Sequence, residues 1–161
     1  MSSGKSLQPT KYAKHKYNIT KPVDFEVAVN YAGVLMAIAG ADGELAEEEL
    51  QWYIEEQELL FTDPAEYVEE IRSFHWQNVN ITELVGKIKY DFPINFRRAI
   101  LYQAIKMSRA DGVYQEQEKV AVAKAAETLG IQHSIVVSIE SLVELEETGD
   151  RLRLALLETE V

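Results

Sequence analysis

The amino-acid sequence predicts a single all-α domain of about seven to eight helices. Apolar residues recur at helical spacing in one segment after another, and no segment shows the strict alternation of a half-buried strand. The proline and glycine residues lie between these segments, where helices begin and end. With 161 residues, of which 47% are hydrophobic, the chain has the size and composition of one globular domain.

Two of the predicted helices are apolar on broad faces and should lie at the centre of the domain. The first covers residues 25–41 and the second covers residues 93–110, beginning at Phe92 or Pro93. Each ends at an Asp-Gly pair, because glycine tolerates the left-handed conformation that a helix exit needs. Five side chains on these helices are expected in the core: Leu35, Ile38, Ile100, Leu101 and Ile105.

The other predicted helices are amphipathic and should pack around the central pair. They are expected at residues 47–60, from about 64 onward, from 80 or 82 to 88, at 116–129, from 133 or 134 to 147, and at 151–158. The residues Thr148-Gly149-Asp150 are expected to separate the last two. The glutamates at 47–49 and at 55, 56 and 58 are interpreted as a solvated helix surface.

Charge is distributed unevenly along the chain. Residues 1–21 contain five lysines and no acidic residue, whereas the other 140 residues contain 11 basic and 27 acidic residues, a net charge of −16. We therefore expect a basic, flexible N-terminal tail at residues 1–21 that adds little stability, and a helical domain at residues 22–161. The acidic domain should repel nucleic acids and anionic membranes. No apolar stretch is long enough to cross a membrane and no secretory signal is recognisable, so a cytoplasmic location is expected.

The chain contains no cysteine and only three histidines. Disulfides, thiolate metal sites and thiol redox chemistry are therefore excluded. No two histidines have the spacing of a zinc motif. Any metal ion bound by this chain should be a hard cation with oxygen ligands.

The two Asp-Gly pairs belong to an internal repeat. Residues 41–49 (ADGELAEEE) and residues 110–118 (ADGVYQEQE) are identical at five of nine positions. Each copy follows an apolar helix and precedes an amphipathic one. Since a single unit cannot bury its own apolar face, the repeat predicts two units packed about a pseudo-twofold axis.

This repeated pattern, an ADG followed by a glutamate six residues after the glycine, resembles the TerB-like family associated with tellurite resistance. The resemblance covers about residues 25–147. It implies the TerB-like helical fold. It also implies that four acidic residues bind a divalent cation such as calcium, magnesium or manganese: Asp42, Glu49, Asp111 and Glu118.

The chemistry of these four carboxylates leaves two interpretations open. In each unit the aspartate lies at a helix exit and the glutamate, seven residues later, lies in the first turn of the next helix. This spacing matches the second half of a calcium-binding EF-hand loop, but the ligands of the first half are missing. Alternatively, the glycines end helices and the carboxylates accept backbone N–H bonds, and then no ion is bound.

The leading functional hypothesis is a non-enzymatic stress-response module of the tellurite-resistance type. It would bind a divalent cation, protein partners, or both, through its acidic Asp-Gly turns. A second copy of the chain is among the partners left open. Direct reduction of tellurite is implausible for an acidic chain without thiols. The alternatives are a metal-dependent hydrolase and a structural scaffold without a bound ion.

Overall fold

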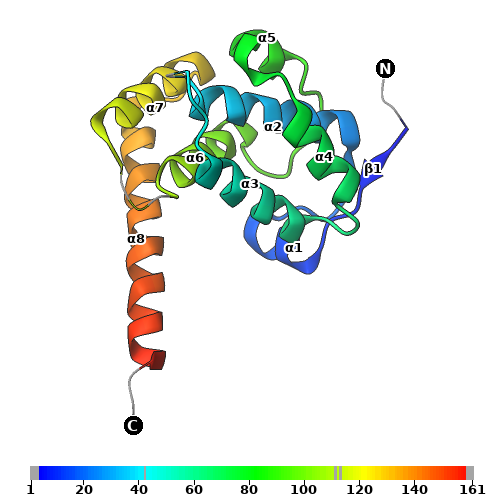
Figure 1. Cartoon of the computed structure of the whole chain (residues 1–161). Coiled ribbons are helices and arrows are strands. Elements are labelled where there is room, and N and C mark those ends of the chain that lie inside the picture. Colours follow the sequence, from blue (N-terminus) through cyan, green and yellow to red (C-terminus); the bar gives the residue numbers. More distant parts are fainter. Residues whose placement is uncertain (1–3, 42, 111, 113, 159–161) are drawn as a thin grey trace.

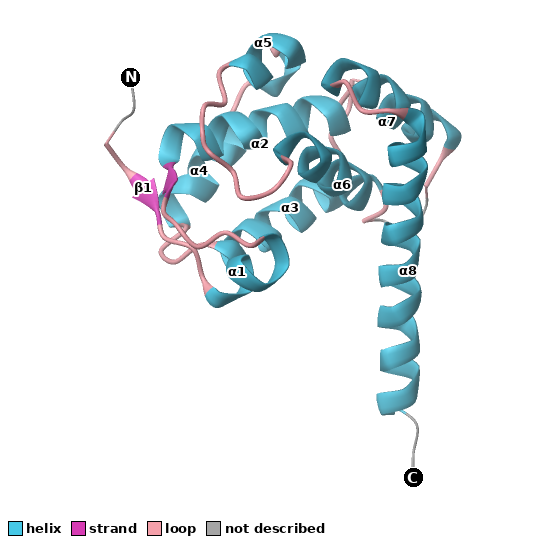
Figure 2. Cartoon of the chain, turned by 180° about the vertical axis from the view of Figure 1, so that it is seen from behind, coloured by secondary structure: helices cyan, strands magenta, loops and turns pink. Residues whose placement is uncertain are grey.

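The computed structural model describes residues 4–41, 43–110, 112 and 114–158. This part of the chain forms eight α-helices, a short 3-10 helix and one pair of two-residue strands (Figure 1; Figure 2). The predicted all-α fold is confirmed. The strand pair is an addition that the sequence did not indicate, since two residues are too few to show alternation. No helix in the described ranges is long and apolar enough to span a bilayer.

The elements follow one another in a simple order. They are β1 (Ser6–Leu7), α1 (Lys11–Tyr17), β2 (Val23–Asp24), α2 (Phe25–Ala39), α3 (Glu47–Leu60), α4 (Ala65–Ser73), η1 (Trp76–Asn78), α5 (Ile81–Gly86), α6 (Phe96–Ser108), α7 (Glu116–Leu129) and α8 (His133–Glu158). Strands β1 and β2 are antiparallel, with Leu7 opposite Val23.

Helices α2 and α6 form the centre of the molecule, as predicted. All five side chains expected in the core are at most 2% exposed. Asp24 caps α2 by accepting the N–H of Glu26 at 2.9 Å. Helix α6 begins at Phe96, later than expected, because Asn95 caps it by accepting the N–H of Arg98 at 3.2 Å.

Helix α8 is one continuous helix, so the break expected at Thr148-Gly149-Asp150 is wrong. A glycine in an exposed helix interior costs only about 1 kcal/mol relative to alanine, which the neighbouring turns can offset. Arg151 donates to Thr148 across the glycine, and Arg153 donates to Asp150 directly after it, so contacts between successive turns support the helix here. The C-terminal half of α8 projects away from the rest of the molecule (Figure 1).

The N-terminal segment packs onto the helical body, which differs from the tail expected at residues 1–21. Leu7, Ala13 and Tyr17 are buried in the common core. The backbone N–H of Thr10 donates to the carbonyl of Leu60 at 2.9 Å, at the end of α3. Only one face of a seven-residue helix is apolar here, and this short pattern is hidden among exposed lysines. The packing therefore shows no boundary near residue 21.

We predict that a chain beginning at Lys21 melts on the order of 10 °C below the full-length chain, because several kcal/mol of core packing and hydrogen bonding are removed. The measurement is thermal unfolding followed by circular dichroism. A chain beginning at Lys5 is the control and should melt with the full-length chain. Equal melting temperatures for all three chains would support the flexible tail that the charge distribution suggested.

Candidate functional site

The two Asp-Gly turns join the helices that the sequence assigned to them. The first connects α2 to α3 and the second connects α6 to α7. Gly43 and Gly112 have φ angles of 101° and 87°, a region that other residues rarely adopt. Asp42 and Asp111 lie outside the described residues. The pseudo-twofold relation between the two units stays a prediction.

The two predicted glutamate ligands lie where the sequence placed them, in the first turns of α3 and α7. Glu118 accepts the backbone N–H of Gln115 at 3.1 Å, which is half of a capping box at the start of α7. Glu49 is half-buried near the start of α3, whose capping position is Ala46. Glu118 therefore has at least one of the structural roles that the sequence allowed. Among the residues that the structure describes, no three acidic or histidine side chains are grouped closely enough to hold a metal ion.

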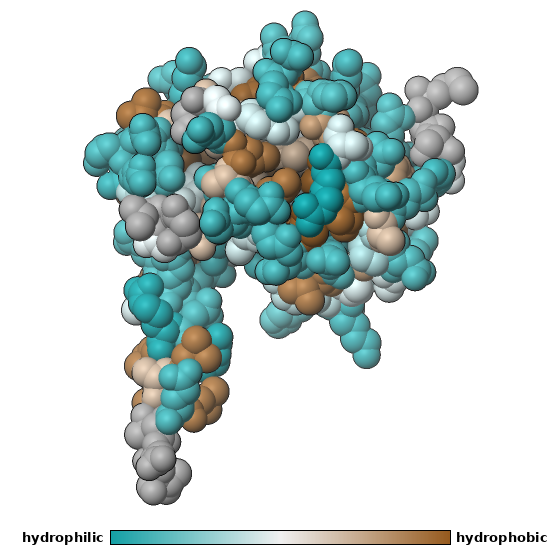
Figure 3. Space-filling view, viewed as in Figure 1, coloured by the Kyte–Doolittle hydropathy of each residue, from teal (hydrophilic) through white to brown (hydrophobic). Residues whose placement is uncertain are grey.

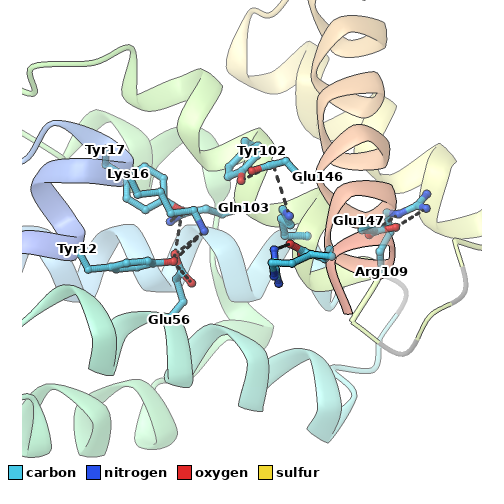
Figure 4. A network of polar contacts seen from close by, with 12 residues as sticks. Tyr12, Lys16, Tyr17, Glu56, Tyr102, Gln103, Arg109, Glu146 and Glu147 are labelled. Carbon is cyan, nitrogen blue, oxygen red and sulfur yellow. Dashed lines mark hydrogen bonds and ion pairs between the residues drawn. The ribbon is translucent and has the colours of Figure 1, made fainter. Parts of the chain in front are cut away.

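The second turn is fastened to α8 by charged and polar contacts. The guanidinium of Arg109 donates two hydrogen bonds to the carboxylate of Glu147, at 2.9 and 2.8 Å (Figure 4). These hydrogen bonds hold the pKa of Glu147 below its ordinary value. Tyr114 donates to Glu140 at 2.9 Å, and its ring lies 5.3 Å from the Arg109 guanidinium. The residues on either side of the second turn, Arg109 and Tyr114, are thus both bound to α8.

The first turn borders an open hollow beside α7. The hollow has a volume of about 530 Å³ and includes Gly40, Gly43, Trp76 and Lys124 in its lining. A Cβ atom at Gly40 would lie 2.3 Å from the indole of Trp76, so the end of α2 needs glycine at this position for close packing. The aromatic ring therefore fixes where the first turn leaves α2.

A polar network that the sequence did not reveal surrounds Glu56 on α3. Its carboxylate is buried and accepts hydrogen bonds from Tyr12 at 3.0 Å, Lys16 at 2.9 Å and Tyr17 at 3.2 Å (Figure 4). The hydroxyl of Tyr17 also accepts from Gln103 of α6 at 3.2 Å. The interpretation of Glu56 as a solvated residue is therefore wrong, because α1 covers this side of α3.

The ionisation of this network follows from its packing. Burial alone would lower the pKa of Lys16, but the hydrogen bonds to Glu56 and Tyr12 raise that pKa above its ordinary value. The stabilisation that Lys16 gains on folding is therefore fully present below pH 10.5 and is lost as the pH rises through the raised pKa. Burial also raises the pKa of Tyr17, which stays a neutral donor. Three donors from α1 thus bind one carboxylate on α3. We call this network, formed by Tyr12, Lys16, Tyr17 and Glu56, the polar clamp, because it joins α1 to α3 in the folded chain.

A broad groove lies between α1, α6 and α8 and has a volume of about 510 Å³. Its lining combines apolar side chains, including Ile94, Ile139 and Leu142, with the charged residues Arg98 and Glu146. Glu146 is held in place, since it accepts the hydroxyl of Tyr102 at 2.6 Å and pairs with Lys106 at 3.4 Å. Such a surface suits an apolar segment with polar flanks. The sequence could not predict the groove, because three helices far apart in the chain form it.

The comparisons with known proteins agree with the resemblance that the repeated ADG pattern suggested. Residues 55–140, more than half of the chain, match the model of the family described as tellurite resistance protein TerB. The chain is also similar to a solved structure, a tellurite resistance protein from Nostoc punctiforme, with 24% sequence identity and a TM-score of 0.78. That likeness covers 94% of this chain and 92% of the other, and it shows a shared fold. No curated protein shows a significant match.

We predict that Glu56→Gln lowers the free energy of unfolding by about 2–3 kcal/mol, because the Lys16 ammonium then loses its charged partner in a half-buried position. Denaturant unfolding at pH 7 measures this change. Glu58→Gln is the control, since Glu58 is exposed on the same helix and should change stability by less than about 0.5 kcal/mol. Equal effects of the two substitutions would show that the polar clamp adds nothing to the free energy of unfolding.

Proposed function

This chain belongs to the TerB family of tellurite resistance proteins, and we propose that it serves tellurite resistance as a non-enzymatic module that binds another protein. The observation that carries the proposal is the groove between α1, α6 and α8. A binding role is consistent with a cysteine-free chain, which has no thiol to reduce or capture the oxyanion.

The chemistry of the groove supports a protein ligand. Leu142 is 47% exposed in the groove, next to the half-buried Ile135 and Ile139 on the same side of α8. Lys16, Arg98 and Glu146 supply charge of both signs around this apolar surface. An amphipathic helix or an extended segment with a few large apolar side chains would bury the exposed leucine and pair with the charges.

The buried carboxylate of Glu56 is not arranged as a catalytic base. Glu56 accepts hydrogen bonds from three donors of its own chain, including the Lys16 ammonium, and these donors occupy its carboxylate oxygens. A base needs a free lone pair facing a substrate. This arrangement favours a binding module over the hydrolase alternative. Turnover of any substrate that is lost in Asp111→Asn would favour the hydrolase instead.

We predict that Leu142→Glu abolishes protection against tellurite, because it places a charge on the apolar part of the groove. The measurement is growth on tellurite of the source strain, after its own copy of the gene has been deleted and replaced by each variant. Val137→Glu is the matched control, since Val137 is also 47% exposed on α8 but does not line the groove. It should protect like the wild type.

Two checks make this result interpretable. Both variants should have wild-type melting temperatures and cellular levels, since both positions are half exposed. Full protection by Leu142→Glu would rule out the groove as the functional surface. Loss of protection with both variants would point to α8 as a whole rather than to the groove.

A second candidate function is weak binding of a divalent cation at the Asp-Gly turns, through Asp42, Glu49, Asp111 and Glu118. The first turn is favoured over the second. Glu44, Glu47 and Glu48 are exposed around the first turn and make it strongly negative. The corresponding positions 113 and 117 of the second unit are occupied by the uncharged residues Val113 and Gln117. An oxygen-rich, acidic loop of this kind suits calcium, magnesium or manganese.

We predict that calcium binds the first turn with a dissociation constant in the sub-millimolar to millimolar range, on the order of an incomplete loop. At ten times this concentration, binding to the folded state should add about 1.4 kcal/mol of stability. The measurement is a thermal melt with calcium against sodium at equal ionic strength. Asp42→Asn should remove the calcium effect, and Asp91→Asn, an exposed aspartate elsewhere, should keep it. Equal shifts with both salts would mean that the turns are structural.

A further inference from the structure

The C-terminal half of α8 exposes large apolar side chains without covering any part of the body. Val136 and Val143 are the buried residues of this 26-residue helix. From Thr148 to Glu158 every residue is exposed. Figure 3 shows hydrophobic atoms on this projecting segment. A helix end of this kind, isolated in water, has little to hold it in place.

Three of the exposed leucines of α8 follow a helical stripe, whereas Leu154 and Leu157 lie outside it. Leu145, Leu152 and Leu156 are 69%, 58% and 67% exposed, and Gly149 lies between the first two. The spacing of four, three and four residues is that of the contact positions in a coiled coil. With 100° per residue, this stripe lies on the side of α8 opposite Val143. The stripe therefore faces away from the body of its own chain.

We propose that the projecting halves of α8 from two copies of this chain pair with each other, antiparallel, about a two-fold axis near residues 150–151. In this arrangement Leu145 meets Leu156 of the second copy. Leu152 meets the Gly149 of the second copy, where the missing side chain leaves room for the leucine. Such an interface is isologous, since the same stripe serves both copies.

The charges beside the stripe are arranged for this partner. Glu146 and Arg153 follow Leu145 and Leu152 in the sequence, on the same side of the stripe. In the antiparallel pair, Arg153 of one copy comes level with residue 148 of the other, two residues from Glu146, which also accepts from Tyr102 and pairs with Lys106 of its own chain. An antiparallel pair therefore places each Glu146 close to the Arg153 of the other copy, twice. In a parallel pair, the uncharged Ser141 and Thr148 would face these positions. Self-complementarity thus favours two antiparallel copies over other occupants of the stripe.

The overall charge of the protein favours contact at this place. Each copy carries a net charge of −11, so two bodies repel each other. Residues 148–158 contain two acidic and two basic side chains: Asp150, Arg151, Arg153 and Glu158. In the antiparallel pair, the Glu147 residues of the two copies, which are ion-paired to the bodies, lie seven residues apart along the axis, roughly 10 Å at 1.5 Å per residue. That exceeds the screening length of about 8 Å at physiological salt, so the helices can pair while the bodies stay apart.

Sedimentation equilibrium over a range of concentrations tests the proposal on the full chain. We expect a monomer–dimer equilibrium with a dissociation constant of about 10–100 μM, as suits a small interface. Leu152→Glu should raise this constant at least about tenfold. Leu154→Glu is the matched control, because Leu154 is 51% exposed on the opposite side of the same segment. It should leave the constant unchanged.

The orientation of the pair is tested by charge reversal. Arg153→Glu should weaken the dimer about tenfold, because it places a second negative charge next to Glu146 at each of the two symmetric contacts. Arg151→Glu makes the same change in charge away from the stripe and should have little effect. Equal weakening by Arg151→Glu and Arg153→Glu overturns the antiparallel arrangement. A wild-type chain that stays monomeric at about 1 mM, or whose stripe binds lipid vesicles or another protein instead, overturns the proposal altogether.

Discussion

Helix α2 has to be covered on all sides, and most of the fold follows from this constraint. Its residues from Ala32 to Ile38 are all buried, including Val34, Leu35 and Met36 in succession. A surface helix would leave one side of this sequence in water. Strand β2, η1 and the helices α4, α5, α6 and α7 all contact α2, so elements from nearly the whole chain are recruited to enclose it. Because α2 fills the centre, the two surfaces proposed to bind partners lie on the outer helices, above all on α8.

The groove and the polar clamp result from the way α1 and α8 are attached to this centre. Helix α1 contacts α3, where Lys16 and the two tyrosines of α1 enclose the carboxylate of Glu56. Helix α8 contacts α6, where Glu146 and Glu147 take hydrogen bonds from Tyr102 and Arg109. Between these two attachments lies the apolar groove. Ion pairs thus position the walls, and apolar side chains make the surface on which a partner would bind.

The sequence predicted best those features that depend on neighbouring residues. The bounds of α7 agree with the prediction at both ends, because Gly130 ends the helix and Glu118 supports its start. The five central core residues were predicted because broad apolar faces on two long helices leave little choice about what is buried. In contrast, the helix break expected at Gly149 is wrong, since the contacts that support the helix around that glycine depend on which side chains meet on the helix surface.

Features that join distant segments could not be predicted in this way. Glu56 is flanked by exposed glutamates, and only the packing of α1, some 40 residues earlier in the chain, shows that it is buried. The groove needs α1, α6 and α8 together. For the candidate cation site, the sequence predicted the position of two residues that the structure describes. Glu49 and Glu118 lie in the helix turns where the sequence placed them, whereas Asp42 and Asp111 lie outside the described residues.

The clamp around Glu56 also bears on how the protein matures on the ribosome. Helix α1 is synthesised well before two of its hydrogen-bonding partners: Glu56 comes 44 residues after Tyr12, and Gln103 comes 86 residues after Tyr17. Contacts of such long range form late and slow the folding of small domains. Until Gln103 has emerged, helix α1 has no complete surface to pack against. Helix α1 is therefore made before these partners and reaches its native environment late.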